Sequence, residues 1–376
     1  MTNRDEYALV LSGGGARAAY QVGVLKSITQ YLPRSHQLPF PVICGTSAGA
    51  INATALACYA SCYHLGVRKL EWVWKNFHSE QVYEASLGKV LSYIARNYFA
   101  SWCTDYFKKT PGSLLNNQPL RQLIKRTVDF HRIDRNIMRG KLNAICLSSS
   151  CYSERNAVNF FQGKSSIPGW KRHNRIGQPC TLEIEHLLAS SAIPLVFPPV
   201  KIGTEYFGDG AVHESAPLSA PIHLGAKKIF IIGVVRDEQN QAPDDSQKRF
   251  TSAQITGHLF DTIFADALES DIERMQRINQ TLSILTPQQL SETELTQVEC
   301  LTINPSQDIQ KIASKYYNNL PGGIKALLRL IGVNQYSESS LLSYLMFEGE
   351  FCQELIQLGY NDGLRHQQKI KAFLKL

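Results

Sequence analysis

Ser47 stands between two glycines, Gly45 and Gly49, in the sequence GTSAG. An apolar run over residues 40–44 precedes it and a run of small residues follows it, which predicts a junction between a strand and a helix. A nucleophilic serine at such a junction occupies a strained turn, and glycine two residues away on either side leaves space for that turn. The helix start also favours the negative charge that develops during attack on an acyl carbon. Ser47 is therefore a candidate nucleophile.

Three consecutive glycines, Gly13, Gly14 and Gly15, follow an expected strand and open an expected helix. Their backbone N–H groups, free of side chains, can bind an anion. One such anion is a pyrophosphate, because the segment satisfies a loose dinucleotide fingerprint, but the next strand ends without the acidic residue that would bind the ribose. A P-loop is excluded because no Lys-Ser or Lys-Thr pair follows at the required spacing. An oxyanion hole opposite Ser47 suits the segment better.

Asp209 is flanked by glycines in the sequence FGDGA, at the end of another apolar stretch. Asp-Gly pairs are frequent in plain turns, and this interpretation stays open for the isolated motif. A serine hydroxyl, however, is a weak nucleophile until a base accepts its proton. A poorly solvated carboxylate has a raised pKa and can be that base. Asp209 is the candidate base that the motif context favours.

The glycine-rich loop, the GTSAG segment, residues 189–200 and the DGA motif at residues 209–211 follow one another in an order that resembles the patatin-like phospholipase family. The resemblance covers about residues 7–305. It implies a serine–aspartate dyad without histidine, with Ser47 as nucleophile and Asp209 as base. It further implies that the loop glycines are the oxyanion donors, and that four residues support the motifs: Arg17, Gly45, Gly49 and Gly210. One departure is Ala18, where the family usually has glycine; it adds a single methyl group at a helix start.

The activity implied by the resemblance is hydrolysis of carboxylic esters of phospholipids, of the phospholipase A or lysophospholipase type, without metal or cofactor. An alternative is a general esterase with a Ser-Asp-His triad, in which the histidine follows the acid in the chain. His213 lies only four residues after Asp209, and His258 and His366 fall in helix-like stretches, so the dyad is preferred. A second alternative is a catalytically weak lipid-binding or regulatory scaffold on the same fold.

Apolar runs alternate with helical periodicity along the chain, as a parallel sheet with crossover helices requires. The expected fold class is α/β, which the resemblance refines to a patatin-like three-layer α/β/α sandwich with a mainly parallel central sheet. We expect a catalytic domain over residues 1–305 and a mainly helical C-terminal extension over residues 306–376. A long amphipathic helix is expected over residues 255–278, after a surface loop at residues 236–249. The expected strands are residues 7–11, 40–44, 142–147, 228–235, 282–285 and 301–303.

Composition fits a sizeable protein with a full core, since the 376-residue chain is 44% hydrophobic and carries a net charge of +7. The scattered basic residues favour a lipid partner over nucleic acid, for which no module is present. Neither a signal sequence nor a bilayer-spanning run is visible, and the nine cysteines suit a reducing compartment. We expect a cytoplasmic protein with peripheral membrane contact, while export without a signal peptide stays open. Residues 316–331 and 93–109 are candidate membrane-contact segments, the first alternatively packing on the core and the second alternatively forming a cap.

Overall fold

The computed structural model describes residues 4–84, 88, 92, 113–236, 257–258, 261–262, 267–330, 332–334 and 340–376. Its strands are β1 (Tyr7–Leu11), β2 (Val42–Thr46), β3 (Ala144–Cys151), β4 (Asn156–Gly163), β5 (Trp170–Arg172), β6 (Arg175–Pro179), β7 (Val200–Ile202), β8 (Glu205–Asp209), β9 (Lys228–Ile232) and β10 (Glu299–Ile303). Its α-helices are α1 (Ala19–Ile28), α2 (Ala48–Cys58), α3 (Tyr63–Lys75), α5 (Gln118–Thr127), α6 (His131–Met138), α7 (Ile184–Ser190), α8 (Ser219–His223), α10 (Ala267–Ser283), α11 (Pro287–Ser291), α12 (Ile309–Lys315), α13 (Gly322–Leu330), α14 (Leu341–Leu345), α15 (Gly349–Arg365) and α16 (Gln367–Leu374).

These strands form one sheet in the order β10-β9-β1-β2-β3-β4-β6-β5, with β8 on β3 and β7 on β8. The run from β10 to β3 is parallel throughout, whereas β4 and β8 pair with β3 in the antiparallel sense. Parallel neighbours need crossover connections, and here helices supply them. The expected α/β class with a mainly parallel central sheet and a helical C-terminal region is confirmed.

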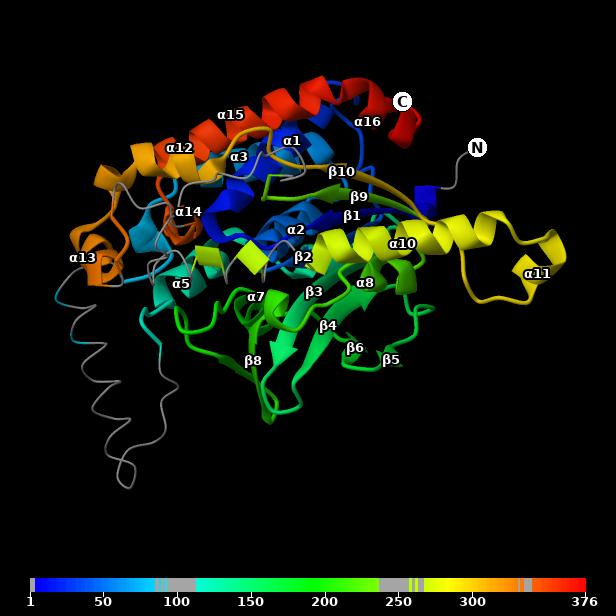
Figure 1. Ribbon diagram of the computed structural model, residues 1–376, viewed down its shortest axis with the longest axis horizontal. Coiled ribbons are helices and arrows are strands. Elements are labelled where there is room, and N and C mark those ends of the chain that lie inside the picture. Colours follow the sequence, from blue (N-terminus) through cyan, green and yellow to red (C-terminus); the bar gives the residue numbers. More distant parts are fainter. Residues whose placement is uncertain are drawn as a thin grey trace, which may run out of the picture.

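Alternate residues of β1 enter two separate hydrophobic cores, one on each face of the sheet. Leu9 and Leu11 belong to the larger core, which α1, α2 and α15 cover. Ala8 and Val10 belong to the smaller core, which α8 and α10 cover. Figure 1 shows α1, α3 and α15 together above the strands and α10 below β9 and β10. A strand buried on both faces reads as a continuous apolar run, which explains why the sequence YALVL was recognisable as a strand.

The edge of β3 is shared by two strands that run toward each other. β2 runs parallel to β3 and ends with Thr46 opposite Ser148, while β8 runs antiparallel and ends with Asp209 opposite Ser149. Adjacent β3 residues thus hold the ends of β2 and β8 close together. These ends are far apart in the sequence: Ser47, just after β2, is already 143 positions from Ser190, which precedes β8. The register of β3 therefore brings the chain after β2 to the end of β8.

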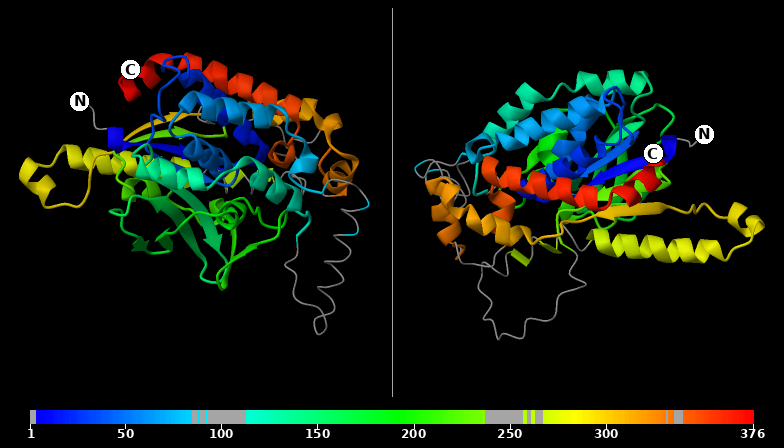
Figure 2. Two further views of the ribbon diagram at one scale, coloured as in Figure 1. Left: turned by 180° about the vertical axis from the view of Figure 1, so that it is seen from behind. Right: turned by 90° about the horizontal axis from the view of Figure 1, so that it is seen from above.

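The C-terminal helices pack on the sheet domain as part of the larger core. The Tyr20 hydroxyl of α1 donates a hydrogen bond to the buried carboxylate of Asp362 in α15, at 3.1 Å. Near the other end, the Tyr7 hydroxyl donates to the Phe373 carbonyl at 3.0 Å. Both views in Figure 2 show α10 and α11, in yellow, projecting beyond the rest of the described chain. A domain boundary near residue 305 stays a prediction.

Several expected elements differ from the structure. Residues 282–285 were expected to form a strand, but Leu282 is buried in the last turn of α10, and the chain then turns toward α11. Helix α10 accounts for the later part of the expected amphipathic helix, and the earlier part falls largely outside the described residues. The expected loop at residues 236–249 also lies largely outside them. The segment at 93–109 also lies outside them.

The candidate membrane-contact segment at residues 316–331 uses its apolar side chains inside the protein. Tyr317, Ile324 and Leu328 are buried in the larger core. These side chains therefore pack in the core, which is the alternative interpretation of this segment. No helix in the described part of the chain combines the length and the apolar character needed to cross a bilayer.

Candidate active site

Ser47 forms a strained turn between β2 and α2. Its φ of 56° and ψ of −128° lie in a region that residues other than glycine rarely adopt. Close backbone approach explains the two flanking glycines. A Cβ on Gly45 would lie 2.6 Å from the Gly49 carbonyl oxygen, and one on Gly49 would lie 2.2 Å from the Leu11 carbonyl oxygen. The turn holds Ser47, only 1% exposed, at the end of β2 and the start of α2.

Ser190, the last residue of α7, secures this turn. Its Oγ accepts a hydrogen bond from the Ser47 backbone N–H at 3.1 Å and donates one to the Ser148 carbonyl at 2.6 Å. The fully buried Ser190 thereby ties the strained residue to β3. Its role was missed at the sequence level, because nothing in the run of two serines at residues 190–191 distinguishes the structural serine from its neighbour.

Asp209 ends β8 and is completely buried. Burial raises the pKa of its carboxyl from 3.8 to about 7, and hydrogen bonding from the Ser47 side chain and the Ala211 N–H offsets part of that rise. The Ala211 N–H donates to Oδ1 at 3.0 Å. In the described chain, Oδ2 has no hydrogen bond of ordinary length and angle, and the Ser47 side chain is near enough to lower the pKa of the carboxyl. The structure thus brings Ser47 and Asp209 together.

The loop of Gly13, Gly14 and Gly15 borders the same site. Gly15 has a φ of +54°, and a Cβ there would lie 2.3 Å from the Tyr344 carbonyl oxygen, so the close contact and the backbone both require glycine. Hydrogen bonds within the described residues leave the N–H groups of all three glycines unused. Of the three, Gly15 lines the pocket that contains Ser47, and the oxyanion role of the loop stays a prediction.

Arg17 lies behind the loop. It is 2% exposed, its Nε donates to the Ser343 Oγ at 2.7 Å, and its guanidinium lies 4.1 Å from the centre of the Tyr344 ring. An ion pair of 3.1 Å joins it to Asp261. Among the described residues, the pocket lining does not include Arg17. Arg17 therefore supports the loop by fixing it to the C-terminal region.

Gln21 fixes the loop from its other side. The side-chain amide of Gln21 donates to the Ser12 carbonyl at 2.8 Å and accepts from Asn52 at 2.9 Å. The carbonyl oxygen of Asn52 in turn accepts from the Trp74 indole N–H at 2.8 Å. These buried polar side chains connect the glycine loop to α2 and α3, and a buried network with satisfied partners holds its members in one arrangement.

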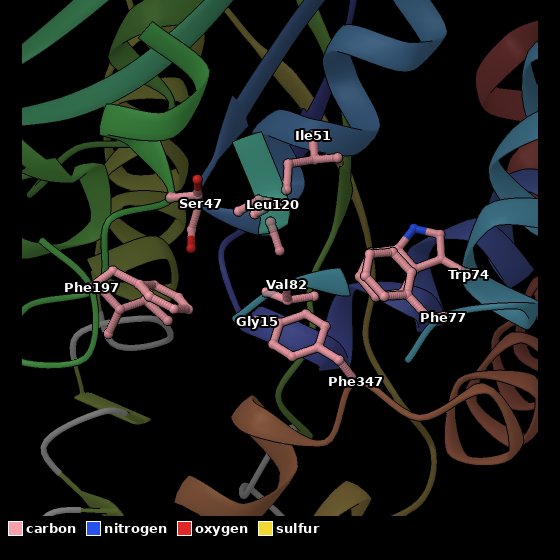
Figure 3. A pocket seen from close by; sticks show the side chains of 12 residues that line it. Gly15, Ser47, Ile51, Trp74, Phe77, Val82, Leu120, Phe197 and Phe347 are labelled. Atoms are coloured by element: carbon pink, nitrogen blue, oxygen red, sulfur yellow. The ribbon is translucent and has the colours of Figure 1, made fainter. Parts of the chain in front are cut away.

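An apolar pocket opens beside Ser47 and contains about 410 Å³ of empty space, part of it open to solvent. Figure 3 shows Ser47 and Phe197 on one side, with Trp74, Phe77 and Phe347 grouped on the other. Apart from Ser47, Ser191 and the backbone of Gly15, its lining is hydrophobic: Ala48, Ile51, Trp74, Phe77, Val82, Leu120, Ile193, Phe197 and Phe347. Such a lining suits an alkyl chain better than a polar substrate.

No histidine of the described chain lines this pocket. The His213 backbone N–H donates to Ser150 Oγ, and no hydrogen bond among the described residues joins the His213 ring to Asp209. His366 contacts the Asp362 carbonyl at the end of α15. In the described ranges, no group of three metal-ligating side chains comes together.

A model of the patatin-like phospholipase family matches residues 9–222, which is more than half of the chain. The chain belongs to this family. The matched range of this patatin-like protein contains the glycine loop, Ser47 and Asp209. The resemblance inferred from the motifs is therefore confirmed, and it places the protein among lipid acyl hydrolases.

Solved structures of two proteins align with this patatin-like chain. VipD from Legionella pneumophila aligns at 10% identity and a TM-score of 0.33, over 99% of this chain and 67% of VipD. Human GIVD cytosolic phospholipase A2, in complex with methyl gamma-linolenyl fluorophosphonate, aligns at 10% identity and a TM-score of 0.43, over 100% of this chain and 60% of the human one. The chain thus spans about two thirds or less of the length of these proteins. Comparison with curated proteins gave no match.

This patatin-like protein contains a second buried acid next to the DGA motif. The Glu214 backbone N–H donates to the Gly210 carbonyl at 3.1 Å, and burial raises the pKa of its side chain from 4.5 to about 7. Asn159, the Ala216 N–H and Arg175 lower that pKa, and Asp271 raises it further. Oε2 has no hydrogen bond of ordinary geometry within the described residues. In the folded protein, the buried Glu214 side chain is therefore mostly neutral below about pH 7.

Replacing Glu214 with glutamine is expected to stabilise this patatin-like fold selectively at high pH. A carboxyl whose pKa is raised on folding contributes fully to the free energy of unfolding at pH values below its unfolded pKa of 4.5. That contribution is lost as the pH rises through the folded pKa of about 7. The advantage of Glu214→Gln over the wild type should therefore grow between pH 5 and pH 8, by up to roughly 3 kcal/mol. Urea unfolding at both pH values measures it, and an equal difference at the two would contradict a buried neutral acid.

Proposed function

We propose that the protein hydrolyses carboxylic esters of phospholipids or related acyl lipids through a Ser47–Asp209 dyad. The observation that carries the proposal is a strained, buried serine beside a buried carboxyl of raised pKa, at the side of an apolar pocket. Family membership supports the general reaction. The roles of individual residues and the substrate class are inferred from the site.

In the proposed first half-reaction, ionised Asp209 accepts the proton of the Ser47 hydroxyl while Oγ attacks the ester carbonyl carbon. The N–H groups of Gly13, Gly14 and Gly15 face the carbonyl oxygen as it becomes negative. Collapse of the tetrahedral intermediate breaks the bond to the leaving alcohol, which takes the proton from Asp209. The product is an acyl ester of Ser47.

In the second half-reaction, Asp209 accepts a proton from water as the water oxygen attacks the acyl ester. The new C–O bond forms, the bond to Ser47 Oγ breaks, and Oγ takes the proton back, releasing a fatty acid. A pKa of about 7 suits this exchange, because the carboxyl is then able both to accept and to return a proton near neutral pH.

A fluorophosphonate probe tests this proposal, because it phosphonylates activated serines. We expect the wild type to be labelled, with mass spectrometry placing the adduct on the peptide that contains Ser47, and to release fatty acid from phosphatidylcholine vesicles and lysophosphatidylcholine micelles. Ser165→Ala, at an exposed serine, is the matched control and should behave as the wild type. Folded wild-type protein that is neither labelled nor hydrolytic would instead favour the scaffold alternative.

A further inference from the structure

One residue of the pocket lining, Phe347, lies more than a hundred residues beyond the part of the chain that the family model matches, in the segment of residues 340–348. The Tyr344 carbonyl lies against Gly15, and the Ser343 hydroxyl accepts from Arg17. Helix α14 is thus packed directly behind the glycine loop. The segment that follows it carries Phe347, whose side chain enters the pocket lining.

The position of Phe347 is fixed from several directions. Its ring centre lies 5.8 Å from that of Phe77, 6.4 Å from that of Trp74 and 6.1 Å from that of Tyr83. The Tyr83 hydroxyl donates to the Leu345 carbonyl at 2.7 Å. On the far side, Glu348 accepts from the Ser79 N–H at 3.3 Å. Ring packing and hydrogen bonds on both sides make this residue a rigid wall.

Phe347 closes the end of the pocket that is remote from the nucleophile. Figure 3 places Trp74 and Phe77 across the pocket from Ser47, with Ile51 and Leu120 between, and Phe347 below Val82, in ring contact with Trp74 and Phe77. The three rings are each 6% exposed or less, so they are packed within the described part of the protein. An acyl chain attached at Ser47 and laid along the apolar lining would meet this wall with its methyl end.

We propose that Phe347 sets the upper limit on the length of the acyl chain that the pocket accepts. This inference rests on the proposed function, because it takes Ser47 as the point of acyl attachment. It assigns selectivity to a residue outside the catalytic motifs. Phe347 acts on the part of the substrate that does not react, so its replacement changes which chains bind productively and leaves the chemistry at Ser47 in place.

The test compares kcat/KM for nitrophenyl esters with acyl chains from butanoyl to palmitoyl. In Phe347→Ala, the optimum should move to longer chains, with a gain of about fourfold for each methylene that the enlarged pocket takes in. Phe347→Leu, which removes less of the wall, should shift the optimum in the same direction by a smaller amount. Trp72→Ala is the matched control, since this aromatic residue on α3 is 65% exposed and does not line the pocket.

The outcomes separate the two proposals. A chain-length optimum that moves in both Phe347 variants, but not in Trp72→Ala, supports the limit that Phe347 sets on acyl-chain length. An active wild type whose chain-length profile stays the same in folded Phe347→Leu overturns the wall alone. A folded wild type that is unlabelled by fluorophosphonate and cleaves no ester of any length overturns the proposed function, and the wall with it.

Discussion

Replacing Ser47 with alanine is expected to lower ester hydrolysis by roughly a thousandfold or more, since no other hydroxyl occupies the strained turn after β2. The substitution removes one oxygen and should leave the fold intact, because the Ser47 backbone N–H can still donate to Ser190. Fatty acid release and fluorophosphonate labelling measure the effect, with thermal unfolding as the check on folding. Substantial hydrolysis by a folded Ser47→Ala protein would remove Ser47 from the mechanism.

Asp209→Asn tests whether the two residues act as one unit. If Asp209 is the base, its replacement should cost about as much as loss of Ser47, and the double variant should be little worse than either single one. The wild-type rate should fall below a pH of about 7, where Asp209 becomes protonated. Additive losses in the double variant would show that Asp209 does not serve Ser47.

Gly49→Ala is expected to be strongly damaging for a change that adds a single methyl group. The added Cβ would lie 2.2 Å from the Leu11 carbonyl oxygen and 2.6 Å from that of Ser12. Since both neighbours are backbone atoms at the end of β1, they have no rotamer to change, and α2 must move away from the sheet. We expect a loss of about 3 kcal/mol in the free energy of unfolding, together with loss of activity as the turn at Ser47 is displaced.

Gly322→Ala is the control for that prediction. Gly322 begins α13, and a Cβ there meets no atom within 4 Å. Alanine at such a position should be neutral or stabilising by about 0.5 kcal/mol, since it restricts the unfolded chain. Denaturant unfolding of both variants gives the comparison. Equal stability of Gly49→Ala and Gly322→Ala would mean that the close approach of α2 to β1 is not needed.

The sequence predicted those parts of the site that depend on local constraints. Gly45 and Gly49 bracket a turn that few residues tolerate, and Ser47 has the positive φ that such a turn requires. The strands β1, β2 and β9 were recognisable because residues buried on both faces form continuous apolar runs. Asp209 could be proposed as a partner only from motif order and resemblance, because the shared edge of β3 that brings it to Ser47 is a matter of register.

Other features could not be predicted, because they are very short or depend on contacts between segments far apart in the sequence. The short strands β5 and β7 have only three residues each, too few for an alternation to be recognised. Ser190 meets Ser47, and Trp74 meets Phe347, only in the folded chain. The strand expected at residues 282–285 was wrong because a four-residue segment with three apolar side chains fits the end of a helix equally well.

The contact between Arg17 and Ser343 joins residues 326 positions apart, which has a consequence for biosynthesis. Chains emerge from the ribosome in order, and domains generally fold as units. The glycine loop and Ser47 emerge early, but the side chains that surround Arg17 and the carbonyl that abuts Gly15 emerge only near residue 344. An arginine without those partners would be a costly charge to bury. We therefore expect the loop to reach its final arrangement only after the chain has been synthesised past α14.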